Sequence, residues 1–463
     1  MAQYVQTYVF DKSGAEIWSG AFNDRYKALD LIPEKYKTVA LGFVLGLKDR
    51  LDGKTKLSGK QIFNKAIDYG FINVDGNLPG LVTVLPKAKI IEKIVEKSNA
   101  DHFKSLNAVE VTFPTFFDFD SKEMQYLARS YEKEDRMFSL GGQDENVRVS
   151  YAADPGYFLW LKDKVFKDNS LPYAVHSQQQ FFRRFKGGEL GDFTRIREFP
   201  GPDLHILCQR DQAKDLYIDN TTISAERMRF LLGDEWCYAM DMTSELFAEL
   251  GNDFVSDICE AIDSICVVNI LEERPRYYGI KSVFMMDAGD CAIMNFNMQW
   301  DEENPKLFNI RNESNDNLVV LHGTLMHSWY KIIPVFLNKV LIDKDLSSFP
   351  YKVAPLQVAL IPVNDDCLEL AEETKARLIK NNVRCQVILP KKNISKALKI
   401  VRKNLVPYYG VIGDKEKTSG VVELTSDSDN KKVELEEFIE NMSCINEATP
   451  VMFFGRYDTE DLF

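Results

Sequence analysis

The hydrophobic and polar positions of the first 75 residues alternate in a way that predicts two short strands. Apolar and polar side chains alternate over residues 4–10, and a second strand-like run covers residues 15–21 after a Lys-Ser-Gly turn. Residues 58–70 have the spacing of a helix, between a capping serine and a terminal glycine. No pattern typical of a chemical site occurs here. We therefore predict that residues 1–75 form a small ordered appendage.

Residues 76–345 mix helical patterns with runs of aromatic and β-branched residues. Helices are predicted at Lys89–Lys97 and Glu123–Glu134. Strands are predicted at Val109–Phe113, Val147–Tyr151, Phe284–Met286 and Ala292–Met298. Because the strands and helices follow no strict βαβ rhythm, the pattern favours an α+β domain with an antiparallel sheet flanked by helices.

From about residue 352 the pattern becomes regular. Strands and helices are predicted in alternation at Leu356–Pro362, Cys367–Lys380, Val383–Leu389, Ser395–Lys403 and Tyr408–Ile412. A hairpin around Val421 and a helix over Glu434–Asn441 follow. Helical crossovers between strands predict parallel pairing. We expect a C-terminal α/β domain over 352–445 and a tail over 446–463.

Composition narrows the classes of protein that fit this pattern. The chain has 463 residues, 45% of them hydrophobic, enough for roughly two to four packed domains. Its net charge of -13 argues against a protein that coats nucleic acid with its whole surface. The longest apolar run, Val39–Leu47, is far shorter than the roughly 20 residues of a membrane helix, and no signal peptide is recognisable. The eight cysteines are scattered singly, so we expect reduced thiols and a cytoplasmic protein without a membrane partner.

The stretch Phe181–Cys208 is the most informative part of the chain. It is predicted as strand, glycine-containing loop and strand, and its cluster of arginines comprises Arg183, Arg184, Arg195 and Arg197. Several guanidinium groups repel one another unless an anion lies between them, and each can grip phosphate oxygens with two donors. From these residues alone, a phosphate-binding hairpin and a solvated basic hairpin are both open.

This stretch resembles the second defining motif of the class II aminoacyl-tRNA synthetases and, within that class, the threonyl-tRNA synthetases. Further resemblances follow in the family's order and cover roughly residues 76–445. Upstream of the stretch, Pro114 lies in a segment similar to the first, dimer-forming motif, and Asp154-Pro155-Gly156 stands where the family has Cys-Pro-Gly. Downstream, Tyr277–Lys281 resembles the family's Tyr-Gly-Pro-Lys segment, and His322 begins the counterpart of the third motif. Ala354–Val358 and Gly413–Glu416 resemble parts of the anticodon-binding domain.

The resemblance implies a ligase that first activates an amino acid with ATP and Mg²⁺ and then transfers it to tRNA. It implies a homodimer, a small amino acid such as threonine, and any editing factor acting in trans. The implied ATP-binding residues are Arg183, Arg195, Phe199 and Lys331, with Arg183 on the α-phosphate and Phe199 on adenine. Asp203 would receive the amino group of the substrate, and Tyr278 and Lys281 would line its pocket.

Several positions depart from the family pattern. Phe185 stands where the family has a glutamate that reads adenine. Lys331 replaces a third-motif arginine, which keeps the charge but loses the two-donor fork. Ile293 falls at the place of a substrate-binding glutamine on the simplest alignment.

The resemblance also implies a zinc site in which one ligand has changed. Threonyl enzymes hold zinc with one cysteine and two histidines, and here Asp154 replaces the cysteine beside His205 and His322. An Asp/His/His set is a legitimate zinc site with open positions. Two other interpretations stay open: Asp154 binds an amine directly, or both histidines are merely packed.

A basic stretch lies near the C-terminus of this acidic chain. Between residues 375 and 417 there are twelve lysines and arginines and only two acidic residues. The helix predicted over Ser395–Lys403 turns Ala397, Leu398 and Val401 inward. A solvated helix face is a common explanation, but the anticodon-domain resemblance favours RNA contact. The predicted tRNA-binding residues are Lys391, Lys392, Lys396, Lys399, Arg402 and Lys403.

Three functions remain open at this point. The first is a working ligase that charges tRNA with threonine or a related small amino acid. The second is a catalytically degenerate paralogue that binds tRNA as a regulatory or accessory subunit, because the adenine-reading glutamate, an arginine and the zinc cysteine are all replaced. The third is adenylate chemistry on a carrier other than tRNA, which the basic C-terminal stretch argues against.

Overall fold

The computed structural model describes most of the chain as two compact units. The described residues are 3–40, 57–133, 135–142, 144–274, 276–290, 292–326, 328–342, 348–389 and 393–449. Unit 1 comprises residues 1–59, 79–81 and 99–331, and unit 2 comprises residues 60–78, 82–98 and 332–463.

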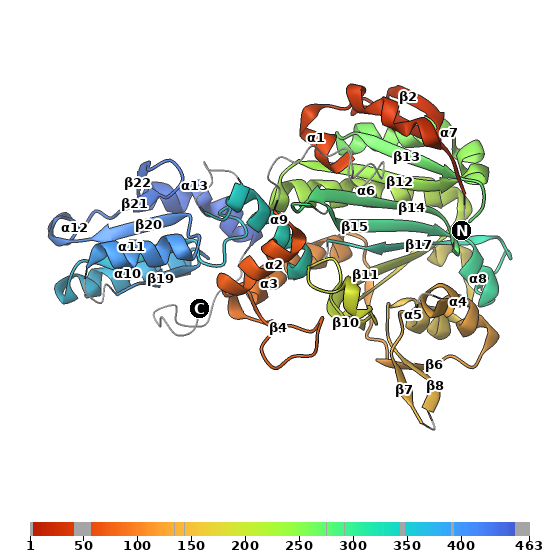
Figure 1. Cartoon of the computed structure of the whole chain (residues 1–463), viewed down its shortest axis with the longest axis horizontal. Helices are drawn as coiled ribbons and strands as arrows, with labels where there is room; N and C mark the ends of the chain where they lie inside the picture. The colour runs from red at the N-terminus through yellow and green to blue at the C-terminus, as the bar shows by residue number, and fades with distance from the viewer. Residues whose placement is uncertain are drawn as a thin grey trace. The chain divides into compact units, whose positions relative to one another are not determined.

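Unit 1 is built on a ten-stranded sheet with the order β2-β1-β13-β12-β14-β15-β17-β11-β10-β5 (Figure 1). Its strands are β1 (Tyr4–Phe10), β2 (Glu16–Ala21), β5 (Val109–Glu110), β10 (Tyr173–Phe182), β11 (Glu198–Gln209), β12 (Trp236–Thr243), β13 (Cys266–Leu271), β14 (Tyr278–Asp287), β15 (Ala292–Asp301) and β17 (Leu318–Thr324). The pairings β12–β13 and β10–β5 are parallel, and the other pairings are antiparallel. The predicted antiparallel-rich sheet with flanking helices is therefore confirmed.

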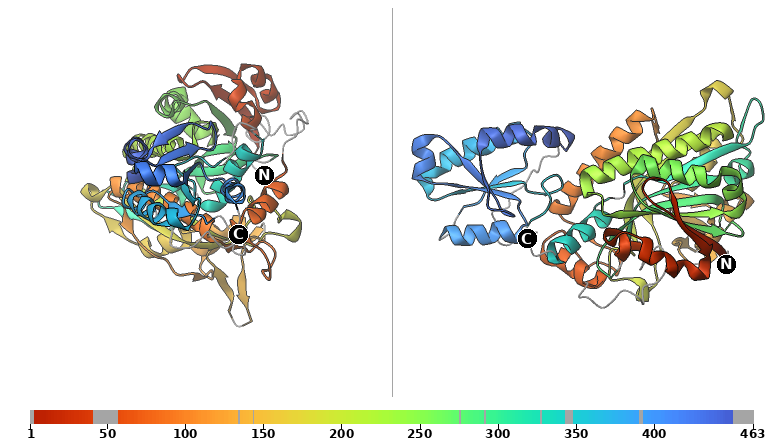
Figure 2. Two further views of the ribbon diagram at one scale, coloured as in Figure 1. Left: turned by 90° about the vertical axis from the view of Figure 1, so that its left-hand side faces the viewer. Right: turned by 90° about the horizontal axis from the view of Figure 1, so that it is seen from above.

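Two long helices, α6 (Arg210–Leu232) and α7 (Ser244–Ile262), pack against each other and against the same face of this sheet (Figure 2). The hydroxyl of Thr243 caps α7 by accepting a hydrogen bond from the backbone N–H of Leu246. The hydroxyl of Tyr217 on α6 lies 2.6 Å from the hydroxyl of Ser282 on β14, so Ser282 faces the helices. Because side chains alternate along a strand, Lys281 faces the opposite side.

The register of the sheet aligns one row of polar side chains on that opposite side. Successive register partners across the central strands are Thr7, Asn269, Asp241, Lys281, Gln299, His322 and His205. Directly paired residues of neighbouring strands project from the same face of a sheet. The row therefore lies on the face that α6 and α7 leave uncovered.

The remaining elements of unit 1 are shorter. They are η1 (Phe22–Leu31), α1 (Glu34–Val39), α4 (Lys122–Lys133), α5 (Asp154–Leu161), η4 (Asp168–Ser170), η5 (Gly187–Glu189), α8 (Glu303–Leu307), a three-stranded sheet of β6 (Phe116–Asp118), β8 (Asp144–Val149) and β7 (Ser139–Gly141), and a pair of β9 (Val165–Phe166) and β16 (Arg311–Asn312). Helices α3 (Pro86–Ser105) and α9 (Trp329–Ile342) contribute residues to both units.

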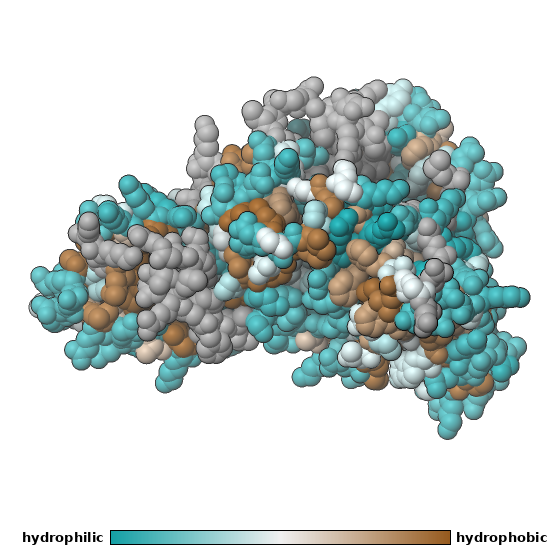
Figure 3. All heavy atoms as spheres, turned by 60° about the horizontal axis from the view of Figure 1, so that its bottom comes forward, coloured by the Kyte–Doolittle hydropathy of each residue, from teal (hydrophilic) through white to brown (hydrophobic). Residues whose placement is uncertain are grey.

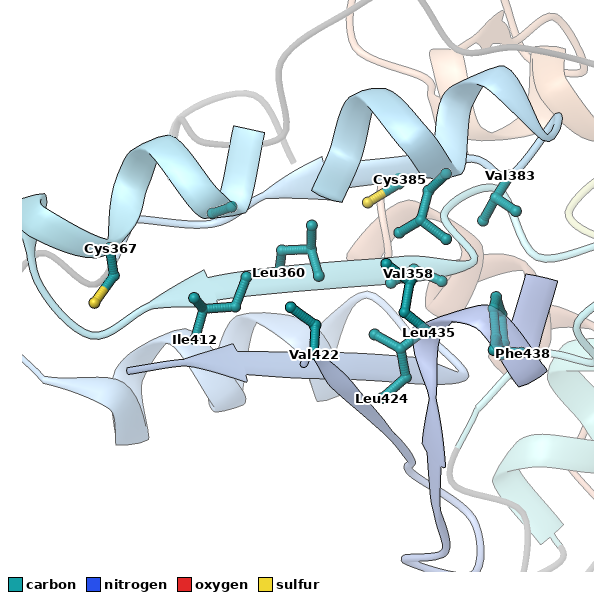
Figure 4. Packing of buried hydrophobic residues seen from close by; sticks show 12 residues of the cluster. Val358, Leu360, Cys367, Val383, Cys385, Ile412, Val422, Leu424, Leu435 and Phe438 are labelled. Atoms are coloured by element: carbon teal, nitrogen blue, oxygen red, sulfur yellow. The ribbon is translucent and has the colours of Figure 1, made fainter. Parts of the chain in front are cut away.

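Unit 2 contains a five-stranded sheet with the order β19-β18-β20-β21-β22. Its elements are α2 (Gly59–Asp68), β3 (Ile72–Asn73), β4 (Thr83–Val84), β18 (Val358–Pro362), η6 (Asp365–Cys367), α10 (Leu368–Lys380), β19 (Cys385–Val387), α11 (Ile394–Lys403), β20 (Tyr408–Ile412), α12 (Asp414–Ser419), β21 (Glu423–Ser426), β22 (Lys432–Glu434) and α13 (Leu435–Ala448). Leu360, Ile412 and Leu424 from three strands gather with Phe438 of α13 in its buried core (Figure 4). As predicted, β18 pairs in parallel with β19 and β20.

The division of the chain differs from the predicted boundaries 1–75, 76–345, 352–445 and 446–463. Strands β1 and β2 continue the large sheet of unit 1, because β1 pairs with β13. Residues 60–78 belong instead to unit 2, so residues 1–75 are not one separate appendage. Helix α13 also extends to Ala448 rather than Asn441. Long-range strand pairing of this kind has no local signal in the sequence.

Among the described residues, no helix is long and apolar enough to cross a membrane. The face shown in Figure 3 carries hydrophobic patches separated by hydrophilic residues. Six of the described cysteines are buried and Cys444 is exposed, and all seven are free thiols, in keeping with their single scattering along the sequence.

Candidate functional site

A cavity of about 330 Å³ lies over the polar row of the unit 1 sheet. Members of that row that line it are Lys281, Gln299 and His322. The loop between β10 and β11 supplies further lining residues, including Arg183, Phe185 and Arg195. The hairpin that sequence analysis singled out therefore covers one part of the cavity, and the sheet supplies another.

Six cationic side chains line this cavity, which gives it a strongly positive character. They are Arg136, Arg183, Arg195, Arg276, Lys281 and Lys331. The carboxylates among its described lining residues are Asp154 and Asp203, and both lie beside His322. Like charges at this density repel one another, and a low-dielectric wall strengthens their field toward an anion in the cavity.

The four arginines of the hairpin have different surroundings. Arg183 and Arg195 line the cavity, whereas Arg184 pairs on the surface with Asp135 at 2.6 Å. The guanidinium of Arg197 donates to the backbone carbonyls of Phe185 and Pro79, at 2.6 and 3.0 Å. Two of the four arginines can thus reach a ligand in the cavity, and Arg197 fastens the loop.

Aromatic rings accompany the cations. The guanidinium carbon of Arg183 lies 5.0 Å from the ring centre of Phe199 and 5.5 Å from that of Tyr131. The ring of Phe185 has two arginines beside it, Arg136 and Arg195, with guanidinium carbons 5.0 and 5.3 Å from its ring centre. Cation–π contacts at these distances are favourable. Phe185, at the place of the family glutamate, therefore offers a flat face rather than a hydrogen-bond acceptor.

Arg136 is held in place by a carboxylate outside the predicted site. Its two terminal nitrogens donate to Glu189 at 2.6 and 2.7 Å, and the backbone N–H of Lys186 donates to the same carboxylate. This bidentate pair is the main reason that the pKa of Glu189 falls to about 2. The guanidinium group of Arg136 is thus held in its orientation by Glu189, which lies in the loop that carries the other arginines.

The predicted substrate carboxylate, Asp203, is buried at the end of the cavity where β11 meets β17. It accepts hydrogen bonds from the hydroxyl of Thr324 at 2.8 Å and from the backbone N–H of Ala153 at 3.2 Å. Its Oδ2 lies 3.7 Å from Nε2 of His322. Asp203 is therefore oriented by fixed donors and borders the cavity.

Asp154, His205 and His322 come together as predicted. Asp154 opens helix α5, and the two histidines are register partners on β11 and β17, with rings stacked 4.2 Å apart. Asp154 Oδ1 lies 3.0 Å from Nδ1 of His322 and 3.9 Å from Nε2 of His205. All three side chains are buried.

Burial and charge act in opposite directions on the pKa values of this cluster. Burial alone would raise the pKa of Asp154, but His322 and His205 outweigh it and leave the pKa well below its usual range. Burial alone would lower the pKa of His322, but Asp154 and then Asp203 raise it well above the ordinary histidine value. The pKa of His205 is lowered, first by burial and then by His322.

The donor set of this cluster fits a divalent metal ion. One ligand atom from each of the three residues lies within 4.8 Å of the others. Nε2 of His205 and both ring nitrogens of His322 are buried without a well-directed hydrogen bond. Orphaned buried imidazole nitrogens are costly unless something binds them, and two imidazoles with a carboxylate are common zinc ligands.

The other predicted pocket residues are also at the cavity. Tyr278 and Lys281 on β14 and Lys331 on α9 line it. Burial and the neighbouring Arg276 lower the pKa of the Lys281 amino group to about 8, while Asp241 acts in the opposite direction. The lysine is therefore poised to gain from an anionic ligand, which would hold it in the charged form.

The cavity has an amide side chain in its wall, although Ile293 falls at the place of the family's glutamine on the simplest alignment. Ile293 is buried outside the cavity, and its neighbour Met294 lines the cavity instead. Further along β15, Gln299 lines the cavity opposite Lys281, and its amide donates to Asn297 at 3.2 Å. A bulge between the partners of Phe284 and Met285 shifts the side-chain alternation of β15, so Met294 rather than Ile293 shares the cavity face with Gln299.

Sequence reasoning missed several lining residues. Arg136 and Arg276 lie far from the hairpin in the sequence and carry no motif, although both add cations to the cavity. Gln299 was missed because it lies in a segment whose sequence pattern predicts a buried strand. An arginine flanking a strand or helix end is too common to be recognised without the fold, so no local signal could have found the first two.

A second group of predicted residues lies in unit 2. On α11, Ala397 and Val401 are buried and Leu398 is half-buried, while Lys396, Lys399, Arg402 and Lys403 are exposed. The predicted facing of this helix is therefore confirmed. Arg402 lies 3.6 Å from Asp427, which offsets part of its charge. Lys391 and Lys392 lie outside the described residues.

Comparison with known proteins assigns the class. The family described as "Anticodon binding domain" matches residues 357–445, the region of the unit 2 sheet. The RNA binding domain of threonyl-tRNA synthetase from Cryptosporidium parvum has a similar fold, with TM-score 0.69 at 18% identity over 86% of this chain and 99% of that one. The prolyl-tRNA synthetase of the same organism gives a TM-score of 0.64 at 13% identity, over 84% of this chain and 75% of that one. The chain has the class II synthetase fold with a C-terminal anticodon-binding domain.

Sequence relatives narrow this class. Threonine–tRNA ligase of Pyrococcus horikoshii is 26% identical over 381 residues, which are 79% of this chain and 60% of that ligase. The enzyme of Pyrococcus furiosus is 26% identical over 389 residues, 81% of this chain and 62% of that ligase. The protein is therefore threonyl-tRNA synthetase-like. It spans about 60% of the length of these relatives.

The cationic cavity predicts binding of a compact polyanion, and neighbouring arginines offer a matched test. Arg183→Ala should weaken pyrophosphate binding roughly 10- to 100-fold, because it removes a charged donor from the cavity wall. Arg184→Ala removes the same charge from the surface pair with Asp135 and should leave the affinity unchanged. Isothermal titration calorimetry at fixed ionic strength measures both. Equal losses in the two variants would mean that general charge, and not the cavity, binds the anion.

Proposed function

We propose that this protein activates a small amino acid, threonine or a close relative, with ATP and transfers it to tRNA. The convergence of six cationic side chains with aromatic faces on one cavity carries the proposal. This combination suits a nucleotide, whose phosphates need positive charge and whose base needs a stacking surface. The threonyl-tRNA ligases among its relatives support the choice of reaction, and the anticodon-binding domain supports tRNA as the acceptor.

In the first step the carboxylate of the amino acid attacks the α-phosphate of ATP, and pyrophosphate leaves with the electron pair of the broken P–O bond. Arg183 holds the α-phosphate, and Arg195 and Lys331 neutralise the charge that develops on the leaving group. Phe199 stacks on the adenine. Such displacements need positioning and charge more than covalent help from the protein. Mg²⁺ enters as the complex with ATP and adds further positive charge.

The amino acid occupies the opposite end of the cavity. Asp203 accepts the ammonium group, since Thr324 and the backbone at Ala153 fix its carboxylate. Tyr278 and Lys281 flank the same end on β14. In the second step the terminal ribose hydroxyl of tRNA attacks the carbonyl carbon of the aminoacyl-adenylate, and AMP leaves.

The replaced positions alter this chemistry without removing its charge. Lys331 supplies a point charge in place of a guanidinium fork, so it orients a phosphate less strictly. Phe185 has two arginines beside its ring, and its side chain accepts no hydrogen bond from a base. We therefore expect weaker recognition of the adenine edge than a carboxylate would give. If recognition of the adenine were lost completely, the protein would be a degenerate paralogue without adenylation activity.

We further propose that Asp154, His205 and His322 hold Zn²⁺. The ligand distances and the orphaned imidazole nitrogens support this assignment. When bound there, the ion would supply Lewis acidity for the amine and hydroxyl of the substrate. A carboxylate ligand in place of a thiolate makes the site harder and more oxygen-rich. Direct binding of the amine by Asp154 is the alternative.

The partners follow from the two units. The exposed lysines and arginine of α11 suit phosphate contacts with tRNA, together with Lys391 and Lys392. The homodimer implied by the first motif would form near β5, which lies at one edge of the ten-stranded sheet and carries the half-exposed Val109. We place the protein in the cytoplasm, where tRNA and reduced thiols occur, with any editing factor acting in trans.

Amino-acid-dependent exchange between ATP and pyrophosphate tests the activation step. Across the twenty standard amino acids, threonine should give the fastest exchange, and Arg183→Ala should abolish it because the α-phosphate loses its main cation. Arg184→Ala is the matched control and should keep full activity, since Arg184 faces the surface. No exchange with any amino acid would favour the degenerate paralogue. Full activity in Arg183→Ala would show that the site assignment is wrong.

Metal analysis of the purified protein tests the zinc site. About one zinc ion per chain is expected by mass spectrometry, and Asp154→Ala should lose most of it because a carboxylate ligand is gone. Asp257→Ala removes a surface carboxylate that pairs with Lys214 and should keep the metal. A metal-free wild type that still shows threonine-dependent exchange would instead support direct amine binding by Asp154.

Charge reversal on α11 tests the tRNA interface. Changing Lys396, Lys399 and Lys403 together to Glu should weaken tRNA binding and lower the slope of log affinity against log salt by about two. The control reverses Lys65, Lys431 and Lys432, three half- to fully exposed lysines of unit 2 outside α11. Filter binding over a salt series measures both triple variants. The same loss in the control would mean that net charge alone governs binding.

A further inference from the structure

The polar row of the sheet continues past the cavity into the N-terminal strand. The hydroxyl of Thr7 on β1 donates to Oδ1 of Asn269 on β13 at 2.9 Å. The amide nitrogen of Asn269 donates to Oδ1 of Asp241 on β12 at 3.2 Å. Asp241 is in turn the register partner of the cavity residue Lys281 on β14. Side-chain hydrogen bonds thus connect β1, β13 and β12, and strand register places the last of these side chains, Asp241, beside the cavity strand β14.

A second contact from β1 reaches the same carboxylate. The hydroxyl of Tyr4 donates to Oδ2 of Asp241 at 3.1 Å, and the Tyr4 ring stacks on Phe22 with centroids 4.6 Å apart. Asp241 therefore has each oxygen engaged by a different donor, one direct from β1 and one relayed through Asn269. Two fixed donors hold a carboxylate in one orientation.

The charged groups around Lys281 show how the Asp241 carboxylate affects its protonation. From the cavity side, Arg276 and Arg183 face Lys281, and both oppose its charge. Tyr278 lies beside it, with the ammonium 6.0 Å from the ring centre, and Gln299 is its neutral partner on β15. Asp241 is the negative group that acts on it from β12. Opposite residues of an antiparallel pair have Cβ atoms about 5 Å apart, so the charge of Asp241 acts on Lys281, although burial and Arg276 act more strongly on its pKa.

We propose that Asp241, oriented by Tyr4 and Asn269, is a positioning residue that keeps Lys281 charged and directed into the cavity, so that the N-terminal strand β1 is part of the support of the active site. The proposal rests on the proposed function where the reaction is concerned. It gives a role to the N-terminal hairpin, which carries no chemical motif of its own.

The pKa of Lys281 sets the direction in which anion binding changes with pH. The pKa of about 8 means that the ammonium is charged below this pH and neutral above it, so any anion binding that uses Lys281 declines as pH rises through 8. Removing the negative charge of Asp241 leaves burial and two arginines unopposed. The pKa of Lys281 then falls further, and the decline moves to lower pH.

The experiment compares the pH dependence of kcat/KM for the amino acid in pyrophosphate exchange, from about pH 6 to pH 10, since this ratio reports the free enzyme. Asp241→Asn should move the alkaline decline down by roughly one pH unit. Tyr4→Phe keeps the ring stack and should give a smaller shift in the same direction. In a Lys281→Gln background, Asp241→Asn should produce no further shift. A purely structural role would lower activity evenly at all pH values.

Lys12→Ala is the matched control, because Lys12 joins the same hairpin to Asp263 through an exposed pair without touching the row. Its pH profile should equal that of the wild type. If Asp241→Asn fails to fold, Tyr4→Phe alone decides, and an unshifted profile in Tyr4→Phe would then overturn the proposal.

A measurement without turnover separates this proposal from the proposed function. The affinity for pyrophosphate, followed by calorimetry over the same pH range, should show the same downward shift in Asp241→Asn. A wild type without exchange activity but with this shift would reject the ligase function and keep the role of Asp241. An unshifted affinity profile in a folded Asp241→Asn protein would reject the role of Asp241.

Discussion

The register of the ten-stranded sheet is the constraint on which the cavity depends. It aligns seven polar side chains from Thr7 to His205 on the face that α6 and α7 leave open. Side chains alternate along every strand, so a slip of one residue between β14 and β15 would turn Gln299 toward the helices and a hydrophobic neighbour into the cavity. The same register stacks His205 on His322. Apolar packing against α6 and α7 fixes this register, because the faces that those helices bury cannot turn outward without losing their contacts.

Electrostatic repulsion explains the further arrangement of the site. Six cations around one cavity raise the free energy of the folded protein, and nearby carboxylates and aromatic rings offset part of this cost. Glu189 orients Arg136, Asp241 is placed opposite Lys281, and aromatic rings lie under Arg183. A bound polyanion relieves the remaining repulsion, so ligand binding and stability are coupled.

The sequence predicts the elements well and their assembly less well. Period-2 and helical patterns located β1, β20 and α11 closely, and the arginine-rich stretch marked the correct hairpin. The sequence patterns could not show that β1 pairs with β13, because strands that pair across more than 250 residues have no local signature in the sequence. Nor could they sort Arg183 from Arg184, because adjacent residues differ only in the side to which the backbone turns them. The Asp154, His205 and His322 cluster was predictable only through the family resemblance, which supplied the spacing that periodicity does not contain.

The replaced residues gain meaning from this electrostatic arrangement. In a site with one guanidinium fork per phosphate, exchanging an arginine for Lys331 would remove an essential pair of donors. Here Arg136, Arg195 and Arg276 line the same cavity, so positive charge persists when one fork becomes a point charge. The guanidinium carbons of two of these cations, Arg136 and Arg195, lie 5.0 and 5.3 Å from the ring centre of Phe185. A carboxylate at this position would neutralise part of the positive field in the cavity, whereas a phenyl ring leaves that field unchanged. Under the proposed function, these substitutions would move recognition from the edge of the base toward the phosphate chain and would keep the positive charge that adenylation requires.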